Sequence, residues 1–276
     1  MKKFLLVTSA IVAAGPAFAA DLPLKAPPMA VPATWTGCHV GGHIGAATDR
    51  SNYSDPGTLV PALGMTQNYA PLGSAFDATG NPGFLGGVQA GCDYQFDNHF
   101  VIGIGGDYSW TNLSNLAVDP FFGGKFGNPV RFSTRTDQIA TFTGRVGYAF
   151  DNVLFYGKGG GAYARDKYNV NNSFAINENQ LGCGANFFVI TGCNTTGSAD
   201  RWGWTAGVGV EWAFAPNWSA MFELDHYGFG AQTVAMSVTN TGGFFVTPAN
   251  LTIKHDIDTV KIGINYRFWS PVVSHY

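Results

Sequence analysis

Ser219, Asp225 and His226 are residue types that act together in hydrolases, and they fall within one short segment. A serine nucleophile needs a histidine base within hydrogen-bonding reach and an acid that orients the histidine. On an extended strand, neighbouring side chains point to opposite faces, so Asp225 and His226 would be separated. The sequence also lacks phosphate-binding loops, nucleotide fingerprints and metal-hydrolase motifs. We therefore expect no enzymatic activity.

His226 and His255 are the candidate ligands for a cofactor, which would be haem. Imidazole is a common haem ligand, and both residues are expected near long loops that each carry a phenylalanine pair. An exposed apolar patch made by these pairs would bind haem or an external surface partner. The pairs are Phe121 and Phe122, Phe187 and Phe188, and Phe244 and Phe245. The simpler interpretation is that the pairs pack loops together, that both histidines are solvated, and that no cofactor is bound.

The four cysteines are expected to form two disulfides. Cys38 and Cys92 lie on the same face of neighbouring predicted strands at similar height, which permits the close approach that a disulfide needs. Cys183 and Cys193 share one loop, which a second disulfide would restrain. No histidine lies nearby at ligand spacing, so we predict no metal site.

Charged residues alternate with apolar residues along the segment from Val260 to Phe268, where Lys261 and Arg267 share one parity. A period of two is typical of a strand with two different faces. The aromatic residues lie on the apolar face, so we infer an apolar outside and a polar inside. Nine charged residues are expected to face inward: Asp93, Asp107, Arg145, Lys158, Glu211, Glu223, Asp225, Lys261 and Arg267. They should pair with one another, because unpaired buried charges are costly, and Glu223 should lie opposite Lys261.

Eight such strands are predicted, and tight turns alternate with long loops between them. The predicted strands are 35–47, 83–96, 99–111, a fourth ending at 150, 153–166, a sixth ending at 214, 217–230 and an eighth ending at 268. Tight turns are expected at 97–98, 151–152 and 215–216. Every second strand ends in an aromatic residue, any residue and Phe. The repeating unit is therefore a pair of strands with one long loop.

Two girdles of aromatic residues flank this pattern. The girdle at the short-turn rim contains Trp35, Tyr94, Phe96, Tyr148, Phe150, Trp212, Phe214, Trp218, Tyr266 and Phe268. The girdle at the long-loop rim contains Trp110, Tyr163, Trp202 and Trp204. Girdles of this kind, with strands longer than the roughly 9 to 11 residues of a tilted crossing, are typical of membrane barrels. We predict an all-β, eight-stranded antiparallel up-and-down transmembrane β-barrel over residues 35–268, with its long loops outside the cell.

Composition agrees with this class. Charged residues make up 12% of the chain, about half the usual share, and the net charge of −3 gives no reason to expect a nucleic-acid partner. Residues 1–19 have the basic start, apolar core and small-residue cleavage site of a signal peptide. Residues 20–34 are predicted to be a disordered Pro-rich leader, and residues 269–276 a C-terminal tail.

Three segments stand out: the leader Ala20-Asp21-Leu22-Pro23, the entry Trp35-Thr36-Gly37 with Val40-Gly41-Gly42, and the closing Gly263-Ile264-Asn265-Tyr266-Arg267-Phe268. Together they resemble the small outer-membrane barrel proteins of Gram-negative bacteria, the OmpA-like, opacity and haemin-binding surface antigens. The resemblance implies an eight-stranded barrel in the outer membrane that contacts outer-membrane lipid and lipopolysaccharide. It also implies insertion by the outer-membrane assembly machinery, which recognises a C-terminal aromatic residue. Eight residues follow Phe268, so either Phe268 or Tyr276 would supply this signal.

The expected function is a structural one with a surface-exposed part. An eight-stranded interior is just wide enough for side chains to fill it, so we predict a plugged barrel. Such a barrel would support envelope integrity and interact with a surface partner through its long loops. The alternatives are binding of haem or a small ligand at the loops, or a small pore.

Overall fold

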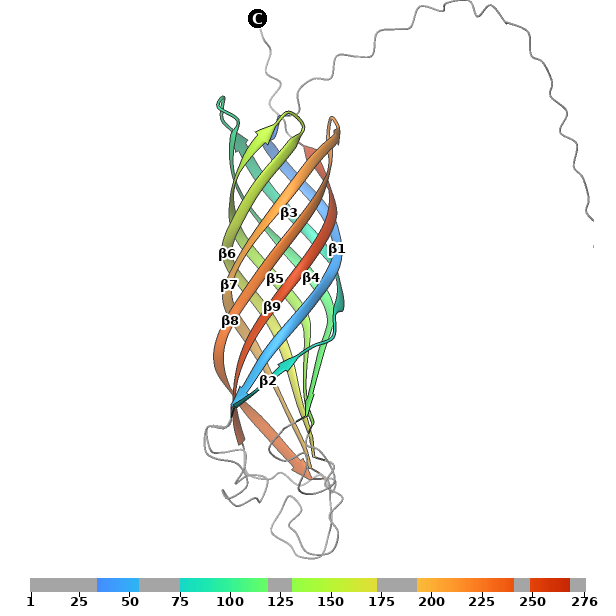
Figure 1. The fold of residues 1–276 in the computed structure, drawn as a ribbon, viewed down its shortest axis with the longest axis vertical. Helices are drawn as coiled ribbons and strands as arrows, with labels where there is room; N and C mark the ends of the chain where they lie inside the picture. Colours follow the sequence, from blue (N-terminus) through green and yellow to red (C-terminus); the bar gives the residue numbers. More distant parts are fainter. Residues whose placement is uncertain (1–33, 55–74, 119–130, 173–192, 241–248, 269–276) are drawn as a thin grey trace, which may run out of the picture. The chain divides into compact units, whose positions relative to one another are not determined.

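The computed structural model describes residues 34–54, 75–118, 131–172, 193–240 and 249–268, which form nine β-strands (Figure 1). The strands are β1 (Gly37–Ser54), β2 (Ala75–Thr79), β3 (Gly83–Gln95), β4 (Phe100–Val118), β5 (Arg131–Phe150), β6 (Val153–Asn172), β7 (Cys193–Ala215), β8 (Trp218–Asn240) and β9 (Ala249–Phe268). Within these ranges, no helix is long and apolar enough to cross a membrane.

Eight of the strands close into a ring. Each pairs antiparallel with its neighbours in chain order, and β1 pairs with both β3 and β9. The β1–β9 seam runs from Cys38 opposite Phe268 to Ser54 opposite Thr252. The predicted all-β fold and eight-stranded antiparallel barrel are therefore confirmed.

The wall has an apolar outer face and a polar inner face. On β9 the outward-facing Ile262 is 53% exposed, whereas the inward-facing Lys261 is 1% exposed. Successive side chains of a strand point to opposite faces, so this contrast repeats at every step from Val260 to Phe268. The outer surface suits lipid, and the charges are collected inside.

Most strands are longer than predicted at the long-loop rim. The third predicted strand ended at Thr111, the fifth at Asp166 and the seventh at Gly230, whereas β4 continues to Val118, β6 to Asn172 and β8 to Asn240. Backbone hydrogen bonds of a ladder do not depend on side-chain type. Apolar alternation stops where lipid contact stops, but the ladder continues past that point. The predicted boundaries were therefore wrong on this side of the barrel.

Bulges interrupt the ladders near the same rim. One lies between Thr136 and Gln138 of β5, and another between Gly228 and Ala231 of β8. A bulge inserts an extra residue and so changes which parity faces inward. On β8 the inward residues are odd-numbered as far as Phe229 and even-numbered from Val234.

Strand β2 was not predicted, because it lies inside the first predicted long loop. It pairs with β1 from Arg50 opposite Thr79 to Ser54 opposite Ala75. The Phe76 ring of β2 contacts those of Tyr53 and Phe132, with centroid distances of 5.3 and 5.1 Å. These aromatic contacts hold β2 against the barrel near the long-loop rim.

Several predictions concern residues outside the described ranges. These are the signal peptide, the leader as far as residue 33, the tail 269–276 with Tyr276, the six loop phenylalanines Phe121, Phe122, Phe187, Phe188, Phe244 and Phe245, and Cys183. The side chain of Cys193 is also outside the described part of the chain.

Candidate functional site: the charged lumen

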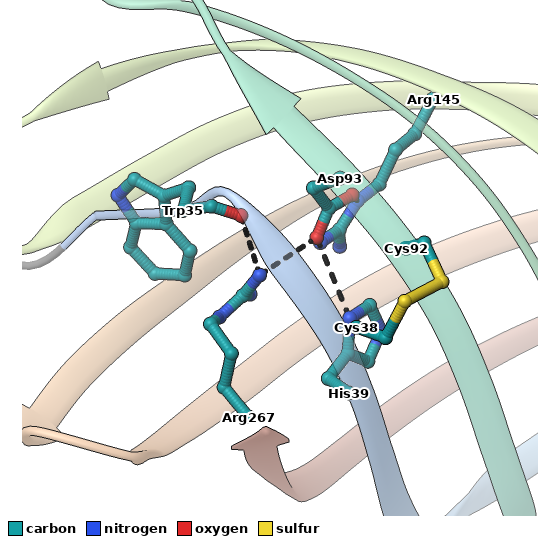
Figure 2. Close-up of a disulfide and its surroundings, with 7 residues drawn as sticks. All are labelled: Trp35, Cys38, His39, Cys92, Asp93, Arg145 and Arg267. Atoms are coloured by element: carbon teal, nitrogen blue, oxygen red, sulfur yellow. Dashed lines mark hydrogen bonds and ion pairs between the residues drawn. A yellow bond between two sulfur atoms is a disulfide. The ribbon is translucent and has the colours of Figure 1, made fainter. Parts of the chain in front are cut away.

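The first group of lumen charges lies near the short-turn rim and contains Asp93, Arg145, Glu211 and Arg267, which we call the lower cluster. Arg145 Nε donates to Asp93 Oδ1 at 2.5 Å, and Arg145 Nη1 donates to Glu211 Oε2 at 3.1 Å. Arg267 Nη1 lies 3.1 Å from Asp93 Oδ2 (Figure 2). Two guanidinium groups therefore neutralise two carboxylates across the lumen.

The lower cluster draws its members from four strands, β3, β5, β7 and β9, so it links opposite sides of the wall. Small residues leave room for these long side chains. A Cβ atom at Gly103 would lie 2.1 Å from Asp93 Oδ1 and 2.9 Å from the carbonyl oxygen of Cys92, so the Asp93 carboxylate would have to move. His39 Nδ1 lies 3.4 Å from Asp93 Oδ2, and Ser219 Oγ donates to Glu211 Oε1 at 2.6 Å.

The second group, the middle cluster, contains Asp107, Lys158, Glu223, Asp225 and Lys261. Lys261 Nζ lies 3.0 Å from both Asp107 Oδ1 and Asp225 Oδ2. Lys158 Nζ lies 3.2 Å from Asp225 Oδ1 and also bonds Glu223. Glu223 is opposite Lys261 in the β8–β9 register, with 3.8 Å between carboxylate and ammonium. The structure thus places all nine predicted lumen charges inside, in two clusters.

A small hollow lies between the two clusters. It is lined by residues of both, including Arg145 and Lys158, and by His39 and Gln89, and it has a volume of about 50 Å³. That volume holds only a few water molecules.

Trp35 is inside the barrel, so its predicted place in the outer girdle was wrong. The ladder of β1 begins at Gly37, whose φ of 137° is a conformation that other residues rarely adopt. Trp35 precedes this glycine and is 1% exposed. Its carbonyl oxygen accepts a hydrogen bond of 2.5 Å from Arg267, whose guanidinium lies 5.2 Å from the centre of the indole ring (Figure 2). The indole packs with Val101, Ala149, Leu154 and Tyr156.

The other predicted girdle residues lie on the outer face. At the short-turn rim the rings of Tyr94 and Phe96 pack at 4.9 Å and those of Trp218 and Tyr266 at 5.0 Å. On β4, the outward-facing aromatic residues Phe100 and Trp110 mark the two rims. The stretch between them matches the roughly 9 to 11 residues that a tilted strand needs to cross a bilayer. Residues farther along each strand lie outside the membrane-spanning segment.

His255 is buried in a third group, the upper cluster, with Asp49, Asp166 and Arg201. His255 Nδ1 lies 2.9 Å from Asp166 Oδ2, and its Nε2 lies 3.5 Å from Asp49 Oδ2. Arg201 Nε lies 3.0 Å from the same Asp166 oxygen.

The upper cluster lies beyond the membrane-spanning segment. Along β9, His255 is farther from the short-turn end at Phe268 than the roughly 9 to 11 residues of a tilted crossing reach. Burial by itself lowers the pKa of His255, but the carboxylates of Asp166 and Asp49 outweigh it and raise the pKa to about 9. His255 is therefore held in its charged form at neutral pH.

This environment overturns the predicted roles of His255. The side chain is 0% exposed, so it is not solvated, and both ring nitrogens face carboxylates, so neither is available to haem iron. His226 points out of the wall instead, with Nδ1 2.7 Å from Asp258 Oδ1. The two histidines thus lie on opposite sides of the sheet and cannot form one site. Within the described ranges, no group of three His, Cys, Asp or Glu side chains is arranged to hold a metal ion.

Sequence reasoning missed Asp49, Asp166 and Arg201 as lumen residues. Their signal was available, because Arg201 shares its parity with the inward Thr205 and Glu211, and His255 shares its parity with Lys261. The first predicted strand ended before Asp49, and Asp166 was the last residue of the fifth, so the parity was not followed to the ends of the strands.

The three hydrolase-type residues are not brought together. Ser219 bonds Glu211 and Asp225 bonds Lys261, both inside the lumen, whereas His226 lies on the outer face. Cys38 and Cys92 are opposite each other in the β1–β3 register and form the predicted disulfide, with Cα atoms 3.9 Å apart (Figure 2).

Comparison with known proteins agrees with this architecture. A family model described as outer membrane protein beta-barrel domain matches residues 6–268. The chain is 28% identical over 274 residues to the 31 kDa outer-membrane immunogenic protein of Brucella melitensis, which covers 97% of this chain and 100% of that protein. It is 24% identical over 281 residues to the 25 kDa outer-membrane immunogenic protein of Brucella abortus, covering 97% and 99%.

Among solved structures, the outer membrane protease OmpT from Escherichia coli superposes with a TM-score of 0.52 at 9% identity, covering 85% of this chain and 98% of that one. At this identity the likeness concerns the fold alone.

Proposed function

Because the chain belongs to the outer-membrane β-barrel family and is located in the outer membrane, we propose that its barrel is a sealed anchor that presents the long loops outside the cell. Its role is structural and surface-exposed: it supports the envelope and holds loops where an external partner can reach them. The long-loop rim faces the exterior in this proposal, as it does in bacterial barrels of known orientation.

The ion pairs that cross the lumen are the observation that carries the proposal. The lower and middle clusters join opposite walls through ion pairs, and Lys261 is 1% exposed. Above them lies an apolar layer that includes Leu85, Leu113 and Ile139, each at most 1% exposed. An ion crossing this lumen would have to displace paired charges and then enter an apolar layer, and both steps are costly.

A surface role is supported by the relatives. The names of the two Brucella proteins describe immunogenic proteins of the outer membrane, and exposure at the cell surface is the simplest physical basis for that property. In this chain, residues 55–74, 119–130, 173–192 and 241–248 all connect strand ends at the long-loop rim. Those four segments are the parts of the sequence that an external partner would meet.

The proposal includes neither haem binding nor catalysis. Haem ligation by His255 is excluded by its two carboxylate neighbours, and His226 lies on the outer wall beside Trp204, with ring centres 5.2 Å apart. A hydrolase would need Ser219, Asp225 and His226 on one side of the sheet, and they are on two.

Single-channel recording in planar bilayers tests the proposal. We expect the purified, folded wild-type barrel to give no conductance steps. An open porin recorded in the same bilayers shows that the assay detects an open barrel. Large, regular steps from the wild type would mean that the chain is a pore.

A further inference from the structure

In the described part of the chain, the lysine and arginine residues lie either in the lumen or on the outward face at the long-loop rim. Five face the lumen, and the remaining six face outward at the long-loop rim: Arg50, Arg131, Arg135, Arg165, Lys167 and Lys254. The outward face between the girdles and the outward face at the short-turn rim carry none of them. The outward cations therefore gather at one end of the barrel.

Four of these six cations lie on two adjacent strands, β5 and β6. Arg165 and Lys167 follow Tyr163 of the long-loop girdle on β6, so they lie past the roughly 9 to 11 residues of a tilted crossing. Arg135 is directly opposite Lys167 in the β5–β6 register. The side chains of Arg135, Arg165 and Lys167 are 64%, 54% and 60% exposed, respectively. We call these three residues the basic patch.

The patch is only partly neutralised. Like charges directly opposite each other on neighbouring strands, such as Arg135 and Lys167, are destabilising. Asp137 reduces this repulsion, because its carboxylate lies 2.7 Å from Arg135 Nε and 2.6 Å from Lys167 Nζ. The hydrogen bond from Lys167, together with Arg135, holds the pKa of Asp137 below its usual range, so this carboxylate stays ionised. Arg165 has only a 3.8 Å contact with Asp200, which also accepts a hydrogen bond from the Tyr163 hydroxyl.

A pair of aromatic side chains, Tyr163 and Trp202, lies directly below the patch on the membrane side. The rings of Tyr163 and Trp202 pack at 5.1 Å on the outer face, and Trp202 is 77% exposed. Exposed Trp and Tyr residues mark the level where hydrocarbon meets headgroups. Arg165 occupies the next outward-facing position after Tyr163 on β6. The patch is thus at the height of the lipid headgroups, and the Tyr163–Trp202 pair is at the height of the first acyl carbons.

The same height on the other side of the barrel has a different charge balance. Arg50 lies 3.9 Å from Asp258 and Lys254 lies 3.3 Å from Asp256, so each cation has its own carboxylate. An excess of positive charge is therefore specific to the β5–β6 side. It does not result from a uniform ring of charges around the rim.

We propose that Arg135, Arg165 and Lys167 bind the phosphate groups of a phosphorylated glycolipid in the outer leaflet, with its acyl chains against Tyr163 and Trp202. A phosphate group can accept paired hydrogen bonds from a guanidinium and attract an ammonium as a point charge. The outer leaflet of a Gram-negative outer membrane consists of such a lipid, lipopolysaccharide. The site goes beyond the anchoring role and does not depend on whether the lumen conducts.

The test compares two double variants of the full-length folded protein in phosphatidylcholine nanodiscs. Arg165→Gln with Lys167→Gln removes two cations of the patch. Arg50→Gln with Lys254→Gln removes one arginine and one lysine from the β1–β9 seam, near its long-loop end, where Asn52 is opposite Lys254. Purified lipopolysaccharide is titrated into each, and its binding is measured. Retention of heat-dependent gel mobility shows that each variant is folded.

We expect the patch variant to bind lipopolysaccharide about 25-fold more weakly than the wild type, because each Lys or Arg near an anionic surface contributes roughly fivefold. The control variant should stay within about twofold, and enzymatically dephosphorylated lipopolysaccharide should bind wild type and patch variant equally. Equal weakening in both double variants would overturn the proposal in favour of diffuse attraction. Full competition by millimolar inorganic phosphate would also overturn it, because the ligand would then be a soluble anion.

Discussion

At the scale of the single residue, His255 couples the stability of the barrel to pH. Its folded pKa of about 9 lies above the ordinary value of 6.5, because the charged form is held by Asp166 and Asp49. A group with a raised folded pKa contributes stability that is fully present below its unfolded pKa. That contribution is lost as the pH rises through the folded pKa.

We therefore expect the free energy of unfolding to fall by about 2–3 kcal/mol between pH 6.5 and pH 9.5. The measurement is urea unfolding in lipid vesicles, followed by tryptophan fluorescence. His255→Gln should be less stable at pH 6.5 and should lose most of this pH dependence. An unchanged slope in His255→Gln would show that other groups cause it.

Residue parity explains which lumen residues the sequence revealed. Most of the nine predicted charges were identified because apolar residues flank them, as Val260 and Ile262 flank Lys261. Asp166 was missed because its outward neighbours Arg165 and Lys167 are charged, so alternation gives no contrast there. Arg201 was missed because it follows Asp200 at the start of its predicted strand. Trp35 was misplaced for another reason: aromatic character is the same for a lipid-facing ring and for one packed under Arg267. Only the backbone turn at Gly37 distinguishes them.

At the scale of the element, the bulge in β8 depends on one glycine. Gly230 has φ of +63°, and an added Cβ atom would meet nothing within 4 Å. Space therefore does not require glycine there, but the backbone conformation does. Gly161 of β6 has equally open surroundings and no such conformation, which makes it a matched control.

We expect Gly230→Val to lower the free energy of unfolding by about 1–2 kcal/mol, the cost of a left-handed conformation for a residue with a Cβ atom. Gly161→Val should be neutral or slightly stabilising, because valine suits a strand. Urea titration of both variants gives the comparison. Equal effects would mean that the bulge is not the cause.

The strands were predictable as elements, but their outer limits were not. The short-turn ends were located closely because an aromatic residue, a polar turn and a new alternation coincide there, as at Phe150, Asp151 and Val153. At the opposite rim the ladder persists through polar residues such as Ser114 and Asn115, which side-chain character alone would assign to a loop. The length of those extensions is set by pairing with a partner strand, and β2 is the clearest example.

At the scale of the whole molecule, the two rims differ, and this difference gives a test of orientation. Asn152 lies in an exposed tight turn, whereas Ser114 is exposed on β4 near the long-loop rim. In a chain with Cys183 and Cys193 replaced by Ser, we expect Ser114→Cys to react with a membrane-impermeant maleimide on intact cells. Asn152→Cys should react only after the outer membrane is disrupted. The reverse pattern would invert the proposed orientation and would remove the basic patch from the outer leaflet.

The seam between β1 and β9 has a mechanical consequence. The two strands are antiparallel, and the chain enters the barrel at Gly37 and leaves it at Phe268, so both ends lie at the same end of the seam. A pulling force between the two chain ends would separate the pair Cys38–Phe268 first and then each following pair in turn. A hydrogen-bonded ladder resists force least when its pairs are separated one at a time. The Cys38–Cys92 bond passes this force from β1 to β3, so β1 is not peeled away alone. Arg267 lies next to the pair that would separate first. Its hydrogen bonds to the Trp35 carbonyl and to Asp93 stabilise the seam at that end.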